Sequence, residues 1–478
     1  MILKEKIKTD AGLQYVVDHL EIMSSVGRRT LLSRPWLTNP SDLETEYDNI
    51  AAAVEVTKDE TKRHAYNDLR HRLMELHDLS GTFNNLASHT VLDEVELFET
   101  KSFTHVVNQA RRAAAELGLD DILQLPDLGE PFALLDPDHT GIANFYIYDS
   151  YDERLTPIRH ELRSQQSLLA SLSQNDENYT PTAQRISDLL AAQNELQNAI
   201  CRDLSDKLFA HHDKLVTAME QMGYADILLA EAELTINWNL CRPTIGESSE
   251  FAMLVNPRLR ERNEKAGLRY QPIDVAFSDG VTLITGANMA GKTVLLKSIA
   301  TAQAMAQFGM YVPTSKAVIT IVDDIYCSIG DEQDEMNGLS SFASEIIKIS
   351  RAIELTTQSR LLVLIDEPAR TTNPIEGKAI VQSLISIMES RPSPTMITTH
   401  YSQLGSNCNR LRVRGFVESM VNVPINPQNI NRFIDYSLIP DQSDEVPQEA
   451  LRIASILGCN TDLVELASRC VCQNEGLD

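Results

Sequence analysis

The segment TGANMAGKTV, which spans Thr285 to Val294, limits the possible folds more than any other part of the sequence. Residues Gly286 to Thr293 have the spacing G-x-x-x-x-G-K-S/T, a strand-like run, VTLIT, precedes them, and a helical pattern starts at Gly291. Free backbone N–H groups and a helix N-terminus in this order form a cradle for phosphate. The segment therefore predicts an α/β domain that binds a nucleoside triphosphate. A chance glycine-rich turn is the alternative, and the strand and helix context argues against it.

Each kind of residue in this loop has an expected role. Glycines let the backbone curl around the phosphates, the ammonium of Lys292 reaches the β- and γ-phosphates, and the hydroxyl of Thr293 is a ligand for Mg²⁺. The residues predicted to bind the nucleotide are Gly286, Ala287, Asn288, Met289, Ala290, Gly291, Lys292, Thr293 and Val294.

A second segment, LLVLIDE, is an apolar strand pattern that ends in Asp366 and Glu367. Carboxylates at the end of a buried strand can bind the shell of a magnesium ion, or orient and deprotonate an attacking water. Asp366 is therefore predicted as a metal residue together with Thr293, and Glu367 as a catalytic residue that acts on water. An acidic pair that only begins a loop is the alternative, which the phosphate-binding loop in the same domain disfavours.

Two further segments carry polar residues at the ends of expected elements. His400 follows the strand pattern TMITT, where its side chain could sense the γ-phosphate, although a lone histidine is more often structural. Ser340 and Ser341 lie at the start of a helical pattern within GDEQDEMNGLSSFASEI. Their hydroxyls could cap this helix or bind an anion.

Taken in order, these segments resemble the ATPase domain of the MutS family, a branch of the ABC ATPases. MutS proteins carry TGPNMGGKST, Y-V-P, D-x-I-F-x-R-x-G, G-x-S-T-F-M-x-E-M, L-V-L-x-D-E, G-R-G-T-S-T-x-D-G and T-H-Y. The resemblance implies hydrolysis of ATP with Mg²⁺. It also places Ser340 in a signature helix that faces the nucleotide of a partner subunit, so a homodimer or a heterodimer with a related chain is expected. The corresponding segments here are TGANMAGKTV, MYVP (310–313), DDIYCSIG (323–330), GLSSFASEI (338–346), LVLIDE (362–367), ARTTNPIEG (369–377) and TTHY (398–401).

The first half of the chain has a helical pattern. Up to about residue 235, apolar residues recur every three or four positions, and the breaks are rich in Pro, Gly, Asn or Asp. The short break at 173–182 predicts an antiparallel hairpin of two helices, at 158–172 and 183–222.

Past residue 240, short apolar strands alternate with helices, which is typical of an α/β domain with a largely parallel sheet. The segments 26–56 and 225–234 resemble the core and the lever helices of MutS proteins. The expected fold is therefore multidomain. An N-terminal all-α core and lever domain (1–240) precedes an α/β P-loop ATPase domain of the ABC type with a C-terminal helical dimerisation segment (241–478). The expected strands are 281–285, 317–322, 361–366 and 395–399.

Three departures from the MutS pattern bear on function. The mismatch-reading and connector domains would precede residue 10, and the DNA clamp would lie where only the polar turn at 173–182 is found, so these domains are not expected here. The segment ARTTNPIEG replaces the glycines of the family loop, and Pro368 follows Glu367, so a stiffer loop is expected. The expected mechanism is a nucleotide-driven change in a dimer that moves helical levers.

Three classes of function fit these features. One is a DNA-repair or recombination ATPase, which is the family role. Another is a protein-remodelling ATPase that reactivates an adenosylcobalamin-dependent amino-acid aminomutase, because MutS-like proteins that accompany such enzymes have a loop similar to DEPARTTNPIEG. A catalytically quiet scaffold is the third. With 42 basic against 68 acidic residues and a net charge of −26, DNA binding is expected to be weak.

The remaining composition points to a cytoplasmic protein. The start, MILKEKIKTDAG, has no apolar signal region, and the aliphatic runs are only as long as strands, so no membrane partner is expected. Seven scattered cysteines lack the spacing of metal ligands, which predicts reduced thiols.

Overall fold

The computed structural model describes residues 1–286, 291–330, 341–405, 408–416, 433–441, 450–456 and 458–474. The chain divides into two compact units. Unit 1 consists of Met1–Leu20, Arg34–Asp48 and Leu234–Asp478, and unit 2 consists of Glu21–Ser33 and Asn49–Glu233. The fold is rich in helix, with two β-sheets in unit 1, which agrees at this level with the mixed fold expected.

The larger sheet of unit 1 is mostly parallel. Its described strands, in spatial order, are β10 (Ile434–Pro440), β9 (Asn409–Phe416), β4 (Gly280–Thr285), β8 (Pro394–Thr399), β7 (Leu361–Asp366) and β6 (Asp324–Ser328). All adjacent pairs from β9 to β6 are parallel, and β10 is antiparallel to β9. Every residue of β4 and β8 is buried, as is typical of central strands in a covered parallel sheet. The predicted strands at 281–285, 361–366 and 395–399 are confirmed.

A smaller sheet holds, in spatial order, β1 (Pro243–Ile245), β5 (Lys316–Ile319), β2 (Ser249–Leu254) and β3 (Ile273–Phe277). The strand predicted at 317–322 is β5, which ends at Ile319 and pairs with β1 and β2. Its expected place in the parallel sheet is therefore wrong. The chain crosses from the smaller to the larger sheet between Ile319 and Asp324, where β6 begins.

Helices cover the larger sheet. Residues of α15 (Ser341–Leu355) and α16 (Pro374–Met388) form one core cluster with residues of β4, β7 and β8. The helix α14 (Lys292–Gln307) contacts β6, β7 and β8, and its alanine-rich sequence is buried over most of its length. The other described helices that lie wholly in unit 1 are α1 (Leu3–Lys6), α2 (Ala11–Asp18), α13 (Pro257–Lys265), α17 (Ala450–Ile456) and α18 (Thr461–Asn474).

Two N-terminal segments fold into unit 1 and hold the start of β6. The ammonium of Lys6 is almost fully buried, 2.8 Å from Oδ1 of Asp324, and donates a hydrogen bond of 2.9 Å to the carbonyl of Ile325. The indole N–H of Trp36 donates to the carbonyl of Val322 at 3.0 Å. A buried ammonium needs such partners, because burial without them is costly.

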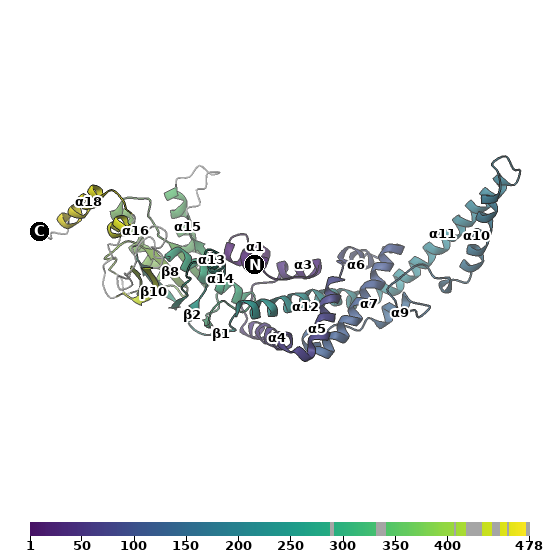
Figure 1. Ribbon diagram of the computed structural model, residues 1–478, viewed down its shortest axis with the longest axis horizontal. Coiled ribbons are helices and arrows are strands. Elements are labelled where there is room, and N and C mark those ends of the chain that lie inside the picture. The colour runs from purple at the N-terminus through teal and green to yellow at the C-terminus, as the bar shows by residue number, and fades with distance from the viewer. Residues whose placement is uncertain are drawn as a thin grey trace. The chain divides into compact units, whose positions relative to one another are not determined.

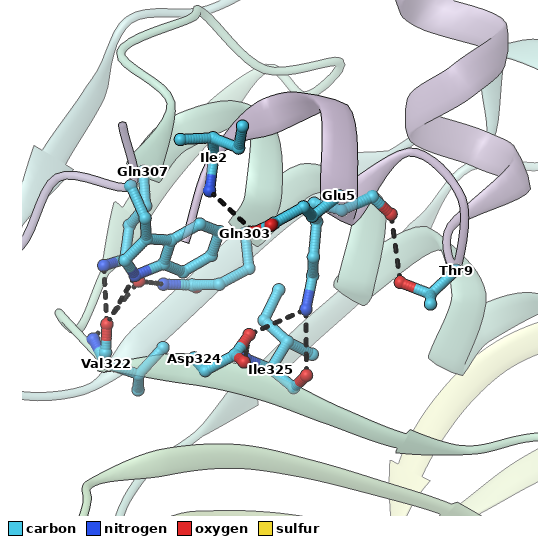
Figure 2. Close-up of polar contacts among 10 residues, drawn as sticks. Ile2, Glu5, Thr9, Gln303, Gln307, Val322, Asp324 and Ile325 are labelled. Atoms are coloured by element: carbon cyan, nitrogen blue, oxygen red, sulfur yellow. Dashed lines mark hydrogen bonds and ion pairs between the residues drawn. The ribbon is translucent and has the colours of Figure 1, made fainter. Parts of the chain in front are cut away.

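The side chain of Gln307, at the end of α14, completes this arrangement (Figure 2). Its amide donates to the carbonyls of Leu37 at 3.0 Å and Val322 at 2.7 Å, and its oxygen accepts from Gln303 at 2.8 Å. The boundary predicted at residue 240 stays a prediction, but unit 1 also includes residues 1–20 and 34–48, which the sequence had placed in the helical domain.

Unit 2 is helical, and no strand is described in it. The hairpin predicted around 173–182 is formed by α10 (Leu155–Ser171) and α11 (Tyr179–Phe209), which pack against each other (Figure 1). The single helix predicted at 183–222 is wrong, because the chain breaks at Ala210 and His211 and α12 follows. No Gly or Pro signals this break. The described helices of unit 2 are α3 (Ser25–Ser33), α5 (Arg63–Met74), α6 (Ser80–Ala87), α7 (Glu94–Leu117), α8 (Asp120–Leu123), α9 (Gly129–Leu134), α10 (Leu155–Ser171) and α11 (Tyr179–Phe209). Parts of α4 (Pro40–Lys58) and α12 (His212–Trp238) and the 3₁₀ turns Glu60–Lys62 and Asp149–Tyr151 also belong to this unit.

A lysine is fully buried inside unit 2. The ammonium of Lys101, on α7, donates to Oδ1 of Asp136 at 2.9 Å, to the carbonyl of Asn144 at 2.8 Å and to the hydroxyl of Tyr148 at 3.0 Å. The two charged side chains are 0% and 3% exposed. Burial opposes ionisation, yet hydrogen bonds from Thr140, from a backbone N–H and from Lys101 hold the pKa of Asp136 well below its usual range.

No helix in the described residues is both long and apolar enough to cross a membrane. The six cysteines whose side chains are described form no disulfide with one another.

Candidate active site

The predicted phosphate-binding loop begins where β4 ends and closes where α14 begins. Gly286 follows β4, and Gly291 has φ 76°, in the left-handed region, as the residue that precedes α14. The backbone angle at Gly291 favours glycine, and a Cβ there would lie only 3.1 Å from Cδ1 of Tyr436, so the neighbouring ring leaves little room for a side chain. The predicted binding residues Ala287, Asn288, Met289 and Ala290 lie outside the described residues.

Lys292 is the first residue of α14, and its side chain is only 4% exposed. Its ammonium donates to the carbonyl of Gly286 at 2.6 Å and lies 3.1 Å from Oε1 of Glu367. The two motifs that are far apart in the sequence therefore meet through a buried ion pair. Val294 lies in the first turn of α14, where its carbonyl accepts a hydrogen bond from Ser298.

The second contact between the motifs involves Thr293 and Asp366. The hydroxyl of Thr293 donates to Oδ2 of Asp366 at 2.6 Å, and the hydroxyl of Thr398 donates to Oδ1 at 2.6 Å. Thr398 pairs with Asp366 in the register of β7 and β8, and its carbonyl and hydroxyl both accept from the N–H of Glu367. The strand β8 thus fixes both carboxylates opposite α14.

His400 follows β8 and lies near the carboxylate of Glu367. Burial lowers the pKa of His400 below its usual value, the charges of Lys292 and Arg370 act in the same direction, and Glu367 opposes them. The imidazole is therefore neutral near pH 7. Nη1 of Arg370 lies 3.6 Å from Oε2 of Glu367, on the side away from the lysine's contact with Oε1.

The structure brings together Gly286, Lys292, Thr293, Asp366 and Glu367, with His400 close by, while Ser340 lies outside the described residues. Sequence reasoning missed three side chains here: Thr398, Arg370 and Tyr436. Thr398 and Arg370 stand within the quoted segments TTHY and ARTTNPIEG, so their position was available as a signal. Tyr436 lies in a strand without a motif.

The donors fit Mg²⁺ and a triphosphate. The pair of Thr293 and Asp366 offers a hydroxyl and a carboxylate, which are the hard oxygen ligands that Mg²⁺ prefers. Among the described residues, no group of three or more His, Cys, Asp or Glu could hold a metal ion alone, so water and phosphate oxygens would complete the shell. The buried ammonium of Lys292 is already balanced by a carboxylate, which shows that the site accommodates an anion beside it.

The described part of the site agrees with the class that the motif predicts. A helix that begins with Lys-Thr after a central parallel strand, with Asp-Glu at the end of a nearby strand, is an arrangement found in P-loop nucleotide-binding domains.

Comparison with known proteins narrows this class. Residues 282–473 match the family model described as MutS domain V. The chain is 36% identical over 222 residues to Endonuclease MutS2 of Thermus thermophilus, and this aligned region covers 46% of this chain and 28% of that protein. It is 24% identical over 522 residues to DNA mismatch repair protein MutS of Haloquadratum walsbyi, covering 96% of this chain and 55% of that protein. The resemblance of the second half to MutS proteins is thus confirmed, and the chain spans about half of the second relative's length.

Proposed function

We propose that this chain is a MutS-type ATPase that binds ATP with Mg²⁺ and hydrolyses it to ADP and phosphate. One observation carries the proposal. Lys292 and Thr293, the two polar residues that end the loop motif, each contact one carboxylate of the second motif, Glu367 and Asp366 respectively. Chance motifs on separate strands have no reason to meet in this pairwise way. The match to MutS domain V supports the same reading.

In the proposed reaction, the ammonium of Lys292 exchanges its partner, the carboxylate of Glu367, for the bound triphosphate. A triphosphate bound in the loop would take over the ammonium of Lys292 and leave the carboxylate of Glu367 as an acceptor for a proton from water. The water oxygen then bonds to the γ-phosphorus while the bond to the bridging oxygen breaks. Mg²⁺, held through Thr293 and Asp366, supplies neutralisation of the phosphate charge. Neutral His400 can hydrogen-bond to a γ-phosphate oxygen without being a permanent charge.

The assembly proposed for this enzyme is a homodimer or a heterodimer with a related chain, in which the segment around Ser340 faces the partner's nucleotide. Nucleotide-driven changes in the dimer would move helices of the domain 1–240, while 241–478 provides the ATPase and dimerisation. The relatives are named for mismatch repair or as an endonuclease, and we propose a MutS-family role on DNA for this chain as well. The net charge of −26 favours weak DNA contacts at physiological salt.

The test of ATP hydrolysis compares two lysines on one helix. Lys292→Ala should reduce phosphate release about 100-fold or more, the usual cost of losing one transition-state charge donor, and should weaken ATP binding. Lys297→Ala is the matched control, because Lys297 lies on the same helix and is exposed. Purified protein is assayed for phosphate release and for binding of a fluorescent ATP analogue. Equal turnover of the Lys292→Ala variant and the wild type would refute the proposal.

A further inference from the structure

The turn that presents Glu367 has an unusual backbone. Glu367 has φ 46° and Ala369 has φ 59°, so both are left-handed, and Pro368 lies between them. This conformation is unfavourable for an L-residue, and the ring of a following proline restricts the preceding residue further. Surrounding groups must therefore hold the turn, as is common where strain serves a site.

Two side chains bind the backbone of Ala369 in this turn. The N–H of Ala369 donates to Oε1 of Glu345 at 2.6 Å, and the hydroxyl of Tyr401 donates to the carbonyl of Ala369 at 2.9 Å. Ala369 itself is completely buried. Because both backbone groups of this residue are bound by side chains from α15 and from the segment after β8, its left-handed conformation is fixed from two directions.

The helix α16 leaves room for this arrangement at one position. A Cβ on Gly377 would lie 2.2 Å from the hydroxyl of Tyr401 and 3.0 Å from the carbonyl of Ala369. Burial, together with the charge of Glu345, raises the pKa of Tyr401. The hydroxyl therefore stays protonated and remains a donor. A glycine, a tyrosine and a glutamate from three separate segments thus converge on one turn.

We propose that Glu345 and Tyr401 are positioning residues for Glu367: by fixing Ala369 in the left-handed conformation, they aim the Glu367 carboxylate at the end of α14. This inference rests on the proposed ATPase function. A turn released from Glu345 and Tyr401 relaxes toward more favourable backbone angles, which moves the carboxylate away from its place 3.1 Å from Lys292. Neither residue touches the reacting atoms, and both act through Glu367.

The experiment separates positioning from binding. Glu345→Ala and Tyr401→Phe should each lower kcat, by up to about 100-fold, because a misplacement near 1 Å has that cost. ATP affinity should stay within about twofold of the wild type, since the loop and Lys292 are untouched. Glu345→Gln keeps an acceptor oxygen for the N–H of Ala369 and should restore most of kcat. Glu354→Ala, an exposed position on the same helix, is the control.

A second background makes the test specific. In a Glu367→Gln protein, adding Glu345→Ala should cause no further loss of turnover, because its effect passes through a residue that is already disabled. Full additivity there, or wild-type kcat in both Glu345→Ala and Tyr401→Phe, would overturn the inference alone. A wild-type protein without any ATP turnover would overturn the proposed function and this inference with it. Tyr401→Phe removes only one hydroxyl, so this variant should fold and can be assayed even if Glu345→Ala does not fold.

Discussion

Lys101 in unit 2 and Lys292 in unit 1 are both buried against a carboxylate, and these two pairs differ in what surrounds them. In unit 2, the ammonium of Lys101 is bound by Asp136, a backbone carbonyl and a tyrosine hydroxyl, and the pair is almost inaccessible to solvent. In unit 1, Lys292 contacts the carbonyl of Gly286 and Glu367, whose side chain is 14% exposed and lies at a strained turn.

The difference separates a pair that fixes a fold from a pair that can change partners. Three short contacts inside unit 2 leave the ammonium of Lys101 with a full set of acceptors, so nothing from outside can improve on them. Lys292 instead begins α14, directly after Gly291, and its carboxylate partner, Glu367, directly follows β7. Similar chemistry therefore serves stability in one unit and, as we propose, catalysis in the other.

The largest expected effect comes from the exchangeable pair. Glu367→Gln should slow ATP hydrolysis by about 10² to 10⁴-fold, because it removes the acceptor for the water proton. Nucleotide affinity should persist, since Lys292, Thr293 and Asp366 remain. Single-turnover hydrolysis and equilibrium binding measure the two quantities separately. If affinity fell together with turnover, Glu367 would be structural, and the contrast with Asp136 would disappear.

The next effect concerns stability. Lys101→Met should destabilise unit 2 by about 3 to 5 kcal/mol, because it leaves Asp136 buried without its cation. Both tryptophans, Trp36 and Trp238, lie in unit 1, so tryptophan fluorescence reports on unit 1 and far-UV circular dichroism on the helices of the whole chain. In urea, the circular dichroism transition should shift to lower concentration while the fluorescence transition stays in place.

The control for this change is an exposed pair in the same unit. Lys207 lies 2.7 Å from Asp203 on α11, with both side chains more than half exposed. Lys207→Met should cost no more than about 0.5 kcal/mol, as is usual for an exposed pair one helical turn apart. Equal shifts for Lys101→Met and Lys207→Met would show that burial gives the first pair no special weight.

The smallest effect is a pH dependence from Asp136. Its pKa is lower in the folded than in the unfolded chain, so the unfolded chain binds more protons in acid. The stability from this group is therefore present above the unfolded pKa of about 3.9 and is lost as pH falls toward the folded value. Between about pH 5 and 3, the wild type should lose about 1 kcal/mol more than Asp136→Asn. Parallel urea midpoints across this range in both proteins would contradict it.

Sequence patterns predicted those features that depend on local chemistry. The three central strands end at residues that the motifs had marked, because apolar runs and glycine spacing act over a few residues. The contact of Lys292 with Glu367 follows from parallel strands that end at one edge. The left-handed angle at Ala369 does not follow, because tertiary contacts from Glu345 and Tyr401 impose it on a residue with no preference for it.

Two other features were out of reach for the same reason. The strand β5 joins the smaller sheet by pairing with β1 and β2, two strands that were not predicted from the sequence. The break between α11 and α12 at Ala210 carries no Gly or Pro, so periodicity alone extends the helix through it. For β5, the deciding contacts join residues far apart in the sequence, and local patterns do not record them.

The packing of the N-terminal segments against unit 1 has a consequence for truncated forms of the protein. A fragment cut at residue 241 would encode every strand of both sheets, yet it would lack Lys6, Trp36 and Leu37. The amide of Gln307 would lose one of its acceptors, the carbonyl of Leu37. The carbonyls of Val322 and Ile325 would each lose a side-chain donor, and buried surface around them would become exposed. The part of the chain that forms unit 1 is therefore discontinuous in sequence, and recombination within the helical region would separate segments that pack together.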